Sequence, residues 1–442
     1  MGSKNSTQPH SSTKGDDPGT SNSTTQEDSS QLVIKMTETE VPAEEYARGG
    51  FLRLNPGHFI NDYQLVKYLG RGAFGTVWLT KHSEAGTYAA MKISRSNRKY
   101  RDFAQREINC LEGINFQGGH PNIVKLMETF ITGQNRINHV VMLFEVLGPN
   151  LESVIFDSGK KLSVEVVKRV SRQLLEAINF INNRKIVHMD IKSANVMLAI
   201  SENDIKNLAS SQDSTCSRYD IDLTKADARI VAKLADFGHV LYTYENMTDM
   251  HPESNCLFRA PEQFLTTEFD TSLDMWSFGC MLYEMVSGSF LFPCKEYTFI
   301  PEHDFIHFML MAHRFGPIRL ADFEDGLRPR FLENFNPDGN INVEVMDESL
   351  PTFFQMAQQK GWSDEDAEEY SSFLLLFFKY NRGERITAGD ALHHDFIRSN
   401  GARRDVRGED APVVPPLSLN HPEAEIEEEF DRVAQNPDAE EN

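Results

Sequence analysis

Three short strings hold the residues of this chain whose types and spacing could do chemistry. They are the glycine-rich turn Gly70–Gly75, the string His188–Asn195 and Asp236-Phe237-Gly238. Glycines let backbone N–H groups approach phosphate oxygens, because no β-carbon stands in the way. Carboxylates and amides in the other two strings are oxygen ligands for a metal ion, and a lysine adds a cation. In this order, the strings predict a site that holds a nucleoside triphosphate and magnesium and moves a phosphoryl group onto a hydroxyl.

The glycine-rich turn lies between two predicted strands, residues 63–69 and 75–79, as in a hairpin with a flexible tip. A dinucleotide-binding turn would instead lead into a helix, so the second strand disfavours that alternative. We therefore expect a flap over a nucleotide. Its cofactor-binding residues would be Leu69, Gly70, Arg71, Gly72, Ala73, Phe74, Gly75, Thr76 and Val77.

Lys92 lies inside a predicted strand, residues 87–93, whose interior should otherwise be apolar. A buried ammonium needs a partner. The candidates are the α- and β-phosphates of the nucleotide and Glu107, which lies on a predicted helix over residues 102–113. The alternative is a surface lysine at a strand edge.

Four polar residues in the second and third strings could act on the phosphoryl group. Asp190 is the expected base or positioning carboxylate for the incoming hydroxyl, and Lys192 would neutralise the moving charge. Asn195 and Asp236 would bind magnesium. Two unrelated polar loops are the alternative. However, a short predicted strand precedes each string, and sites are usually built at strand ends.

The order of predicted elements indicates an α+β fold with two lobes. Strands and one helix occupy residues 63–147, and helices such as 164–182 and 274–286 dominate residues 148–397. Residues 201–229 interrupt this pattern as an inserted loop. We expect two disordered regions, the Ser/Thr-rich residues 1–55 and the acidic tail 402–442, although apolar positions within 31–60 could pack on the domain.

Residues 63–397 resemble eukaryotic protein kinases. Further ordered landmarks carry the resemblance: His120–Val124, Ala260-Pro261-Glu262, Asp274–Gly279 and Arg385. It implies the bilobal kinase fold, with a small β-rich lobe containing one key helix and a larger helical lobe. It also implies ATP and Mg²⁺ as cofactors and a pair between Glu262 and Arg385. Adenine would contact the hinge residues Glu145 and Leu147, with Phe144 as a bulky gatekeeper.

The string around Lys192 resembles serine/threonine kinases, and residues 145–151 resemble the CMGC hinge. The nearest groups in appearance are the SR-protein kinases, the Cdc2-like kinases and the dual-specificity tyrosine-regulated kinases. The resemblance implies transfer to Ser or Thr of proteins, with arginine/serine-rich or basic substrates. The alternatives are a pseudokinase scaffold, a dual-specificity kinase and a small-molecule phosphotransferase. The complete catalytic set disfavours the scaffold, and Ala260-Pro261-Glu262 disfavours the small-molecule enzyme.

One position departs from the family pattern. Met189 replaces the arginine that usually precedes the catalytic aspartate and meets a phosphate on the activation segment. We therefore expect activity that survives phosphatase treatment, although Tyr242, Thr243, Tyr244 and Thr248 could still be modified.

Composition limits the classes of partner and the cellular compartments that suit this chain. Its 442 residues carry a formal net charge of −22, which excludes a general nucleic-acid binder and suits either a cationic partner or a soluble surface. The five scattered cysteines have no CxxC spacing, as in reduced cytoplasmic or nuclear proteins. Met1–Ser6 match an N-myristoylation pattern, so weak membrane contact would require acylation of Gly2. A Ser/Thr-rich tail that begins with Gly by accident is the alternative, and a monomer is expected.

Overall fold

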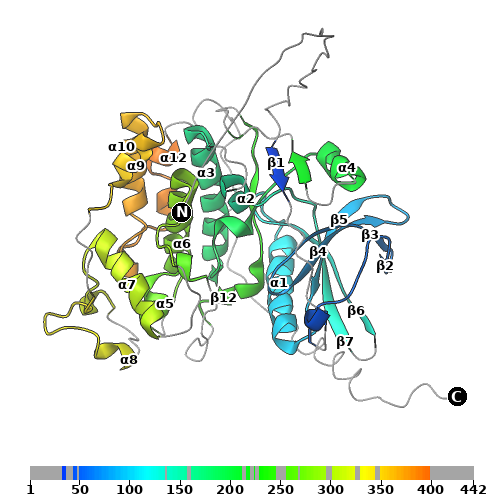
Figure 1. The fold of residues 1–442 in the computed structure, drawn as a ribbon, viewed down its shortest axis with the longest axis horizontal. Coiled ribbons are helices and arrows are strands. Elements are labelled where there is room, and N and C mark those ends of the chain that lie inside the picture. The colour runs from blue at the N-terminus through cyan, green and yellow to red at the C-terminus, as the bar shows by residue number, and fades with distance from the viewer. Residues whose placement is uncertain are drawn as a thin grey trace, which may run out of the picture.

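Alternation of side chains between two faces builds an antiparallel sheet around the glycine-rich turn, and this sheet forms the smaller lobe in the computed structural model (Figure 1). The strand order is β2-β3-β4-β5-β7-β6. Its strands are β2 (Phe59–Ile60), β3 (Tyr63–Arg71), β4 (Gly75–His82), β5 (Tyr88–Ser94), β6 (Leu126–Gln134) and β7 (Ile137–Phe144).

The structure describes residues 32–35, 43–46, 49–134, 137–156, 161–211, 216–219, 223, 228–244, 255–266, 269–294, 301–323, 329–343 and 349–398. The expectations for Gly2, for Thr248 and for the acidic tail 402–442 lie outside the described residues. None of the helices in the described part of the chain is both long and apolar enough to span a membrane.

Side chains of strand β7 alternate between the two faces of the sheet and pack in different cores. Val141 and Leu143 pack in one core with Trp78 and Met91, whereas Met142 belongs to the core beneath helix α1 (Arg98–Phe116). Asn97 caps α1 by accepting a hydrogen bond from the Lys99 amide at 3.0 Å. The buried face of α1 carries one charged residue, Glu107, toward the sheet.

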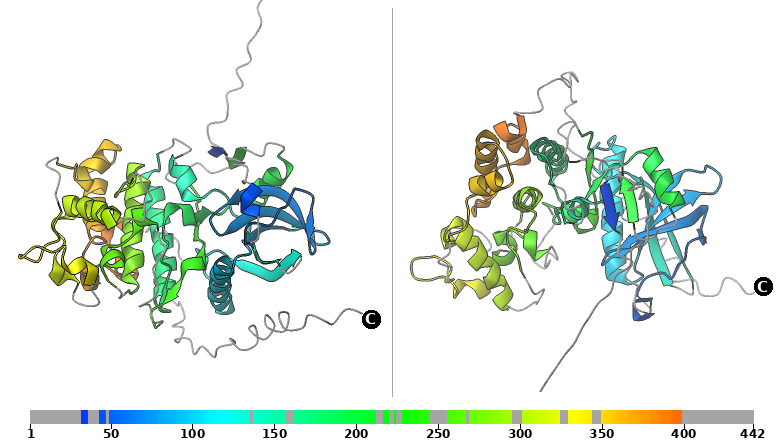
Figure 2. Two further views of the ribbon diagram at one scale, coloured as in Figure 1. Left: turned by 60° about the horizontal axis from the view of Figure 1, so that its bottom comes forward. Right: turned by 45° about the horizontal axis from the view of Figure 1, so that its top comes forward.

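The larger lobe is helical. Its helices are α2 (Leu151–Phe156), α3 (Val164–Asn182), α5 (Pro261–Leu265), α6 (Ser272–Ser287), α7 (Pro301–Phe315), α8 (Pro329–Leu332), α9 (Phe353–Gln359), α10 (Asp364–Leu375), α11 (Ala388–Ala391) and α12 (Asp395–Arg398). Short strands between the lobes are β8 (Ile186–Val187), β9 (Val196–Leu198), β11 (Ala232–Leu234) and β12 (Leu241–Tyr242). Figure 2 shows the blue and cyan strands on one side and the yellow and orange helices on the other.

Helix α6 is the centre of the larger lobe. It is buried almost all round, with Trp276 and Phe278 fully enclosed. A β-carbon at Gly279 would lie 2.6 Å from that of Phe377, so this position requires glycine. The predicted helix over 164–182 coincides with α3, and the one over 274–286 lies inside α6. The predicted two-lobed α+β fold is therefore confirmed.

The expectation of a loop over residues 201–229 is wrong for its first part. Residues Glu202–Ser210 form helix α4, and Ser201 caps it by accepting from the Asp204 amide at 3.1 Å. Leu208 of α4 packs with Leu79 and Val146, so the insertion buries an apolar face against the sheet. This burial offsets the conformational entropy that a loop would keep.

Residues 31–60 pack on the domain where they are described, as one of the two expectations for this stretch had it, so disorder does not extend to residue 55. Strand β1 (Leu32–Lys35) pairs with β10 (Cys216–Tyr219) from the insertion. A short helical turn, η1 (Ala43–Tyr46), follows. Phe51 is buried beneath the Arg95 guanidinium, which lies 4.5 Å from the centre of its ring. One aromatic anchor thus holds this lead-in against the smaller lobe.

A buried ion pair ties α5 to the end of the larger lobe. Arg385 donates to the two carboxylate oxygens of Glu262 at 2.5 and 2.9 Å, and both side chains are almost wholly shielded from solvent. The guanidinium also donates to the Ser272 carbonyl at the start of α6. Such a bidentate pair fixes the relative position of the segments it joins.

Replacing Arg385 by leucine should lower the free energy of unfolding by about 3–5 kcal/mol, because Glu262 would keep a buried charge without its partner. Urea denaturation followed by circular dichroism measures this. Arg382→Leu is the matched control: Arg382 pairs with Asp270 at 3.5 Å on the surface, so its loss should cost less than about 1 kcal/mol. Equal effects of the two substitutions would contradict a special role for the Glu262–Arg385 pair.

Candidate active site

Lys92 forms the first group of the site, because its ammonium lies between two carboxylates. Its Nζ atom is 2.6 Å from Oε2 of Glu107 and 2.9 Å from Oδ1 of Asp236. The three residues come from β5, α1 and the segment after β11, so the contact joins the two lobes. The predicted partner Glu107 is therefore in place, and the surface alternative for Lys92 is excluded.

Burial and charge act in opposite directions on this group. Burial alone would lower the pKa of Lys92, but the carboxylates of Asp236 and Glu107 raise it above its ordinary value. Burial raises the pKa of Asp236, but the Lys92 ammonium, together with the nearby His239 and Lys192, lowers it to about 2. Burial raises the pKa of Glu107 despite the same ammonium. At neutral pH the Lys92 ammonium is thus charged and faces an ionised Asp236.

Asp190 organises the second group. Its Oδ2 atom accepts from Nζ of Lys192 at 2.6 Å and from Nδ2 of Asn195 at 2.8 Å. Asp190 and Asn195 are buried, and the Asn195 carbonyl accepts from the amide of Ala235, the neighbour of Asp236. The two polar strings of the sequence therefore meet at one place.

The backbone around Asp190 is held in an unusual conformation. Met189 and Asp236 have φ angles of 70° and 63°, in the left-handed region that side chains other than glycine rarely adopt. Asp274 of α6 accepts from the amides of His188 and Met189 at 2.9 and 3.1 Å. His188 is fully buried against the ring of Phe237, with centroids 4.8 Å apart. Such support is what a strained backbone at a functional site requires.

A cavity of about 420 Å³ opens beside the Lys92 group, within the range of small-molecule sites. Twelve of the predicted binding residues line it: Leu69, Gly70, Arg71, Gly72, Phe74, Gly75, Val77, Lys92, Glu107, Glu145, Leu147 and Asp236. Ala73 is exposed at the tip of the turn, and the Thr76 hydroxyl accepts from the Trp78 indole, so neither lines the cavity. Phe144 lines it as expected of a gatekeeper.

Several residues that line this cavity were not predicted from the sequence: Ala90, Val124, Asn150, Ser153, Met197 and Leu208. Leu208 belongs to α4, inside the segment that we expected to be a loop. The signal was present in the sequence as the Ser201–Asp204 capping box followed by apolar residues at helical spacing.

The tip of the glycine-rich turn packs down onto neighbouring elements. The ring of Phe74 lies 5.0 Å from those of Phe103 on α1 and His239 after Asp236. At Gly75, a β-carbon would overlap the carbonyl group of Ile93. These contacts close the turn over the cavity.

The comparisons with known proteins agree with this geometry. A family model described as "Protein kinase domain" matches residues 63–397. This chain belongs to the protein kinase family. The kinase is 29% identical over 392 residues to "Serine/threonine-protein kinase SRPK" of Physarum polycephalum, covering 80% of this chain and 90% of that protein. It is also 28% identical to "Serine/threonine-protein kinase AFC3" of Arabidopsis thaliana, covering 83% and 95%.

A third relative, "Dual specificity tyrosine-phosphorylation-regulated kinase 3" of Rattus norvegicus, is 28% identical, with 81% of this chain and 57% of that protein covered. The crystal structure of another kinase domain matches with a TM-score of 0.60 at 23% identity, covering 78% of this chain and 98% of that one. The protein is therefore an ATP-dependent serine/threonine protein kinase. It uses a divalent metal and acts on protein substrates.

Stability of the kinase should fall as the pH drops from 6.5 toward 4, in part through His188. Burial lowers the pKa of His188 from 6.5 to about 4, so in this range the unfolded chain binds a proton that the folded chain does not. Denaturant titrations at several pH values would show a slope for His188→Asn that is shallower by up to about 1.4 kcal/mol per pH unit. The exposed His393→Asn is the control, and an unchanged slope in His188→Asn would contradict the assignment.

Proposed function

We propose that this kinase transfers the γ-phosphoryl group of Mg²⁺-bound ATP to serine or threonine side chains of arginine/serine-rich or other basic proteins. We assign the catalytic and binding roles because two groups of polar residues lie together beside one cavity. These groups are Lys92 with Glu107 and Asp236, and Asp190 with Lys192 and Asn195. Phosphoryl transfer depends mainly on positioning and on stabilisation of charge, and both groups supply this.

The proposed step begins at Asp190. The substrate hydroxyl oxygen attacks the γ-phosphorus, the bond from that phosphorus to the β–γ bridging oxygen breaks, and ADP leaves. Asp190 accepts the hydroxyl proton, and the Lys192 ammonium, 2.6 Å from Asp190, offsets negative charge on the transferred group. Lys92 holds the α- and β-phosphates, since Glu107 keeps its ammonium in place.

The residues around Asp236 suit a hard divalent cation. The Asn195 amide nitrogen donates to Asp190, which leaves the amide oxygen for a cation, and Asp236 adds a carboxylate. Mg²⁺ prefers such oxygen ligands and keeps further ligand positions for phosphate oxygens. When bound, it would neutralise charge on the β- and γ-phosphates.

The proposed substrate class rests on similarity and on charge. The relatives include a kinase named SRPK, and the net charge of −22 favours encounter with cationic peptides. One acidic stretch, residues 364–369, contributes less than its sequence indicates. Lys168 pairs with Asp366 at 2.8 Å and with Glu369 at 3.0 Å, and the first turn of α10 uses its acidic residues against the helix dipole. The remaining acidic surface would therefore supply most of the attraction.

Asp190→Asn should reduce phosphoryl transfer at least about 100-fold, because the amide cannot accept the proton. Binding of ATP should change little, since Asp190 does not line the cavity. Radiolabelled transfer with Mg²⁺ and equilibrium nucleotide binding measure the two effects. Asp338→Asn, an exposed aspartate on the larger lobe, is the matched control. Full transfer by Asp190→Asn would exclude the proposed role of this carboxylate.

An arginine/serine-rich peptide should be phosphorylated more efficiently than a matched peptide in which glutamine replaces each arginine. The expected difference in kcat/KM is at least about tenfold at low salt and shrinks as added salt screens the attraction. Equal rates for the two peptides would overturn the substrate class and leave the kinase activity itself intact.

A further inference from the structure

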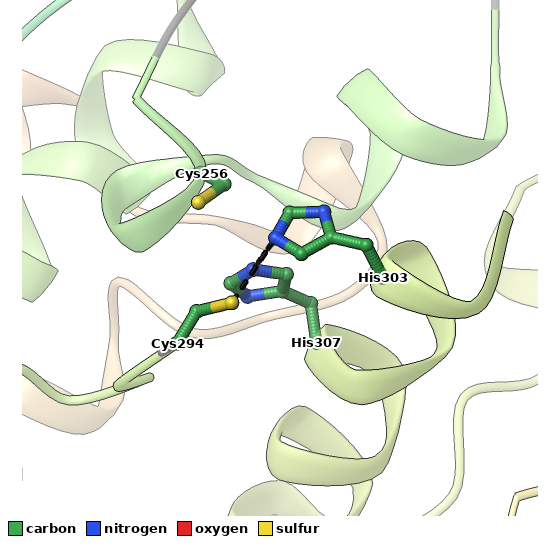
Figure 3. A group of neighbouring side chains, drawn as sticks. All are labelled: Cys256, Cys294, His303 and His307. Atoms are coloured by element: carbon green, nitrogen blue, oxygen red, sulfur yellow. Dashed lines mark hydrogen bonds between the residues drawn. The ribbon is translucent and has the colours of Figure 1, made fainter. Parts of the chain in front are cut away.

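Four side chains outside the ATP site point toward one another at the base of the larger lobe: Cys256, Cys294, His303 and His307 (Figure 3). Their sulfur and nitrogen atoms all lie within 4.8 Å of one another. Neither cysteine forms a disulfide. No residue of this cluster takes part in the proposed phosphoryl transfer.

Two distances inside the cluster are close to the edges of a metal tetrahedron. Nε2 of His303 lies 3.3 Å from Nε2 of His307 and 3.1 Å from Sγ of Cys294. Zinc–nitrogen bonds of about 2.0 Å and zinc–sulfur bonds of about 2.3 Å place two nitrogens about 3.3 Å apart and a nitrogen and a sulfur about 3.5 Å apart. Small adjustments of the side chains would therefore seat one ion between the four atoms.

Local structure explains why the four side chains converge. His303 and His307 are one turn apart on α7, so both project from the same face of the helix. Cys256 begins the short helical turn η4 (Cys256–Phe258), and Cys294 follows α6. Cys256 is 38 residues before Cys294, whereas Cys294 is only nine residues before His303. Spacing along the chain alone would therefore not group the four residues.

Burial makes the cluster costly without a ligand. Cys256, His303 and His307 are 5%, 8% and 0% exposed. Nδ1 of His307 has no hydrogen-bond partner among the described residues, and its Nε2 faces another histidine nitrogen. Buried polar groups normally find partners, and an ion is one reason for an exception. A metal bond to Nε2 would compensate part of this cost.

We propose that Cys256, Cys294, His303 and His307 bind a structural Zn²⁺ ion in tetrahedral geometry. Two thiolates and two imidazoles form a complete ligand set, which is typical of structural rather than catalytic zinc. Each cysteine gives up its thiol proton when the ion binds, so the two thiolate charges balance the charge of the ion. Soft sulfur ligands favour zinc over magnesium or calcium.

The proposed ion would tie the end of the activation segment to α7. Cys256 stands four residues before Ala260-Pro261-Glu262, and Phe264 of α5 stacks on His307 with ring centroids 5.5 Å apart. Buried Met189 cannot hold a phosphorylated activation segment, because it carries no cation. Zinc would thus restrain the same segment without phosphorylation.

Elemental analysis of the full chain, expressed with zinc and purified without chelators, tests the proposal. We expect one zinc ion per chain, and His303→Ala and Cys256→Ser should each weaken zinc retention by at least about tenfold. The controls are His393→Ala, an exposed histidine, and Cys110→Ser, a buried cysteine of α1; both should keep their zinc. Cobalt in place of zinc should give the visible absorption of a tetrahedral thiolate complex in the wild type and lose it in Cys256→Ser.

A folding defect in the variants would not obscure the result, because the wild type is tested by itself. Removing zinc with a chelator should increase hydrogen exchange in residues 255–260 and 301–308, and restoring zinc should reverse the increase. Absence of zinc and of the cobalt spectrum in folded wild type would overturn the proposal. So would a disulfide between Cys256 and Cys294 in a non-reducing peptide map, or a different metal held by the same residues.

Discussion

The contact on which the active site depends is the ammonium of Lys92 between Glu107 and Asp236. It brings together a strand of the smaller lobe, the helix α1 and the segment that follows β11. Each carboxylate would be costly to bury alone, and the lysine would be costly to bury without them. The position of α1 is thereby linked to Asp236 through Lys92, so an outward movement of α1 would leave Glu107 without its partner and Lys92 paired with Asp236 alone. Within this group the Lys92 ammonium is the cation that phosphate oxygens could contact from the cavity.

Around that contact, the larger lobe acts as a rigid support. Asp274 accepts hydrogen bonds from two successive amides and holds Met189 in its left-handed conformation, and Glu284 accepts from the hydroxyl of Ser193 at 2.8 Å. Both acids lie on α6, the helix that is buried almost all round. The catalytic string is therefore fixed from below by the most protected element of the fold, whereas the glycine-rich turn above it is anchored by a few aromatic contacts. The reacting groups rest on a rigid helix, whereas the glycine-rich turn above them is held less firmly. This difference suits repeated entry and release of nucleotide.

Sequence patterns predicted most of this arrangement because the informative signals are local. Alternation marked the strands, helical spacing marked α3 and α6, and the order of polar strings indicated that Lys92, Asp190 and Asp236 share one site. Relations between distant segments were harder to predict. Phe51 and Leu208 lie in stretches that mix apolar and polar residues, and only the folded chain shows the surfaces that they cover. The cysteines at 256 and 294 look scattered for the same reason, since their convergence with α7 depends on how the larger lobe packs.

Helix α4 has a consequence for chemical selectivity. Leu208 lines the same cavity as the hinge residues Glu145 and Leu147, although it belongs to an insertion rather than to the common elements of the site. An inhibitor that fills the cavity out to this wall would contact a side chain supplied by the segment between β9 and β11. Such a compound would distinguish this enzyme from kinases with a different segment there, even where the nucleotide-contacting residues are the same. The insertion thus adds a wall of its own to the nucleotide cavity.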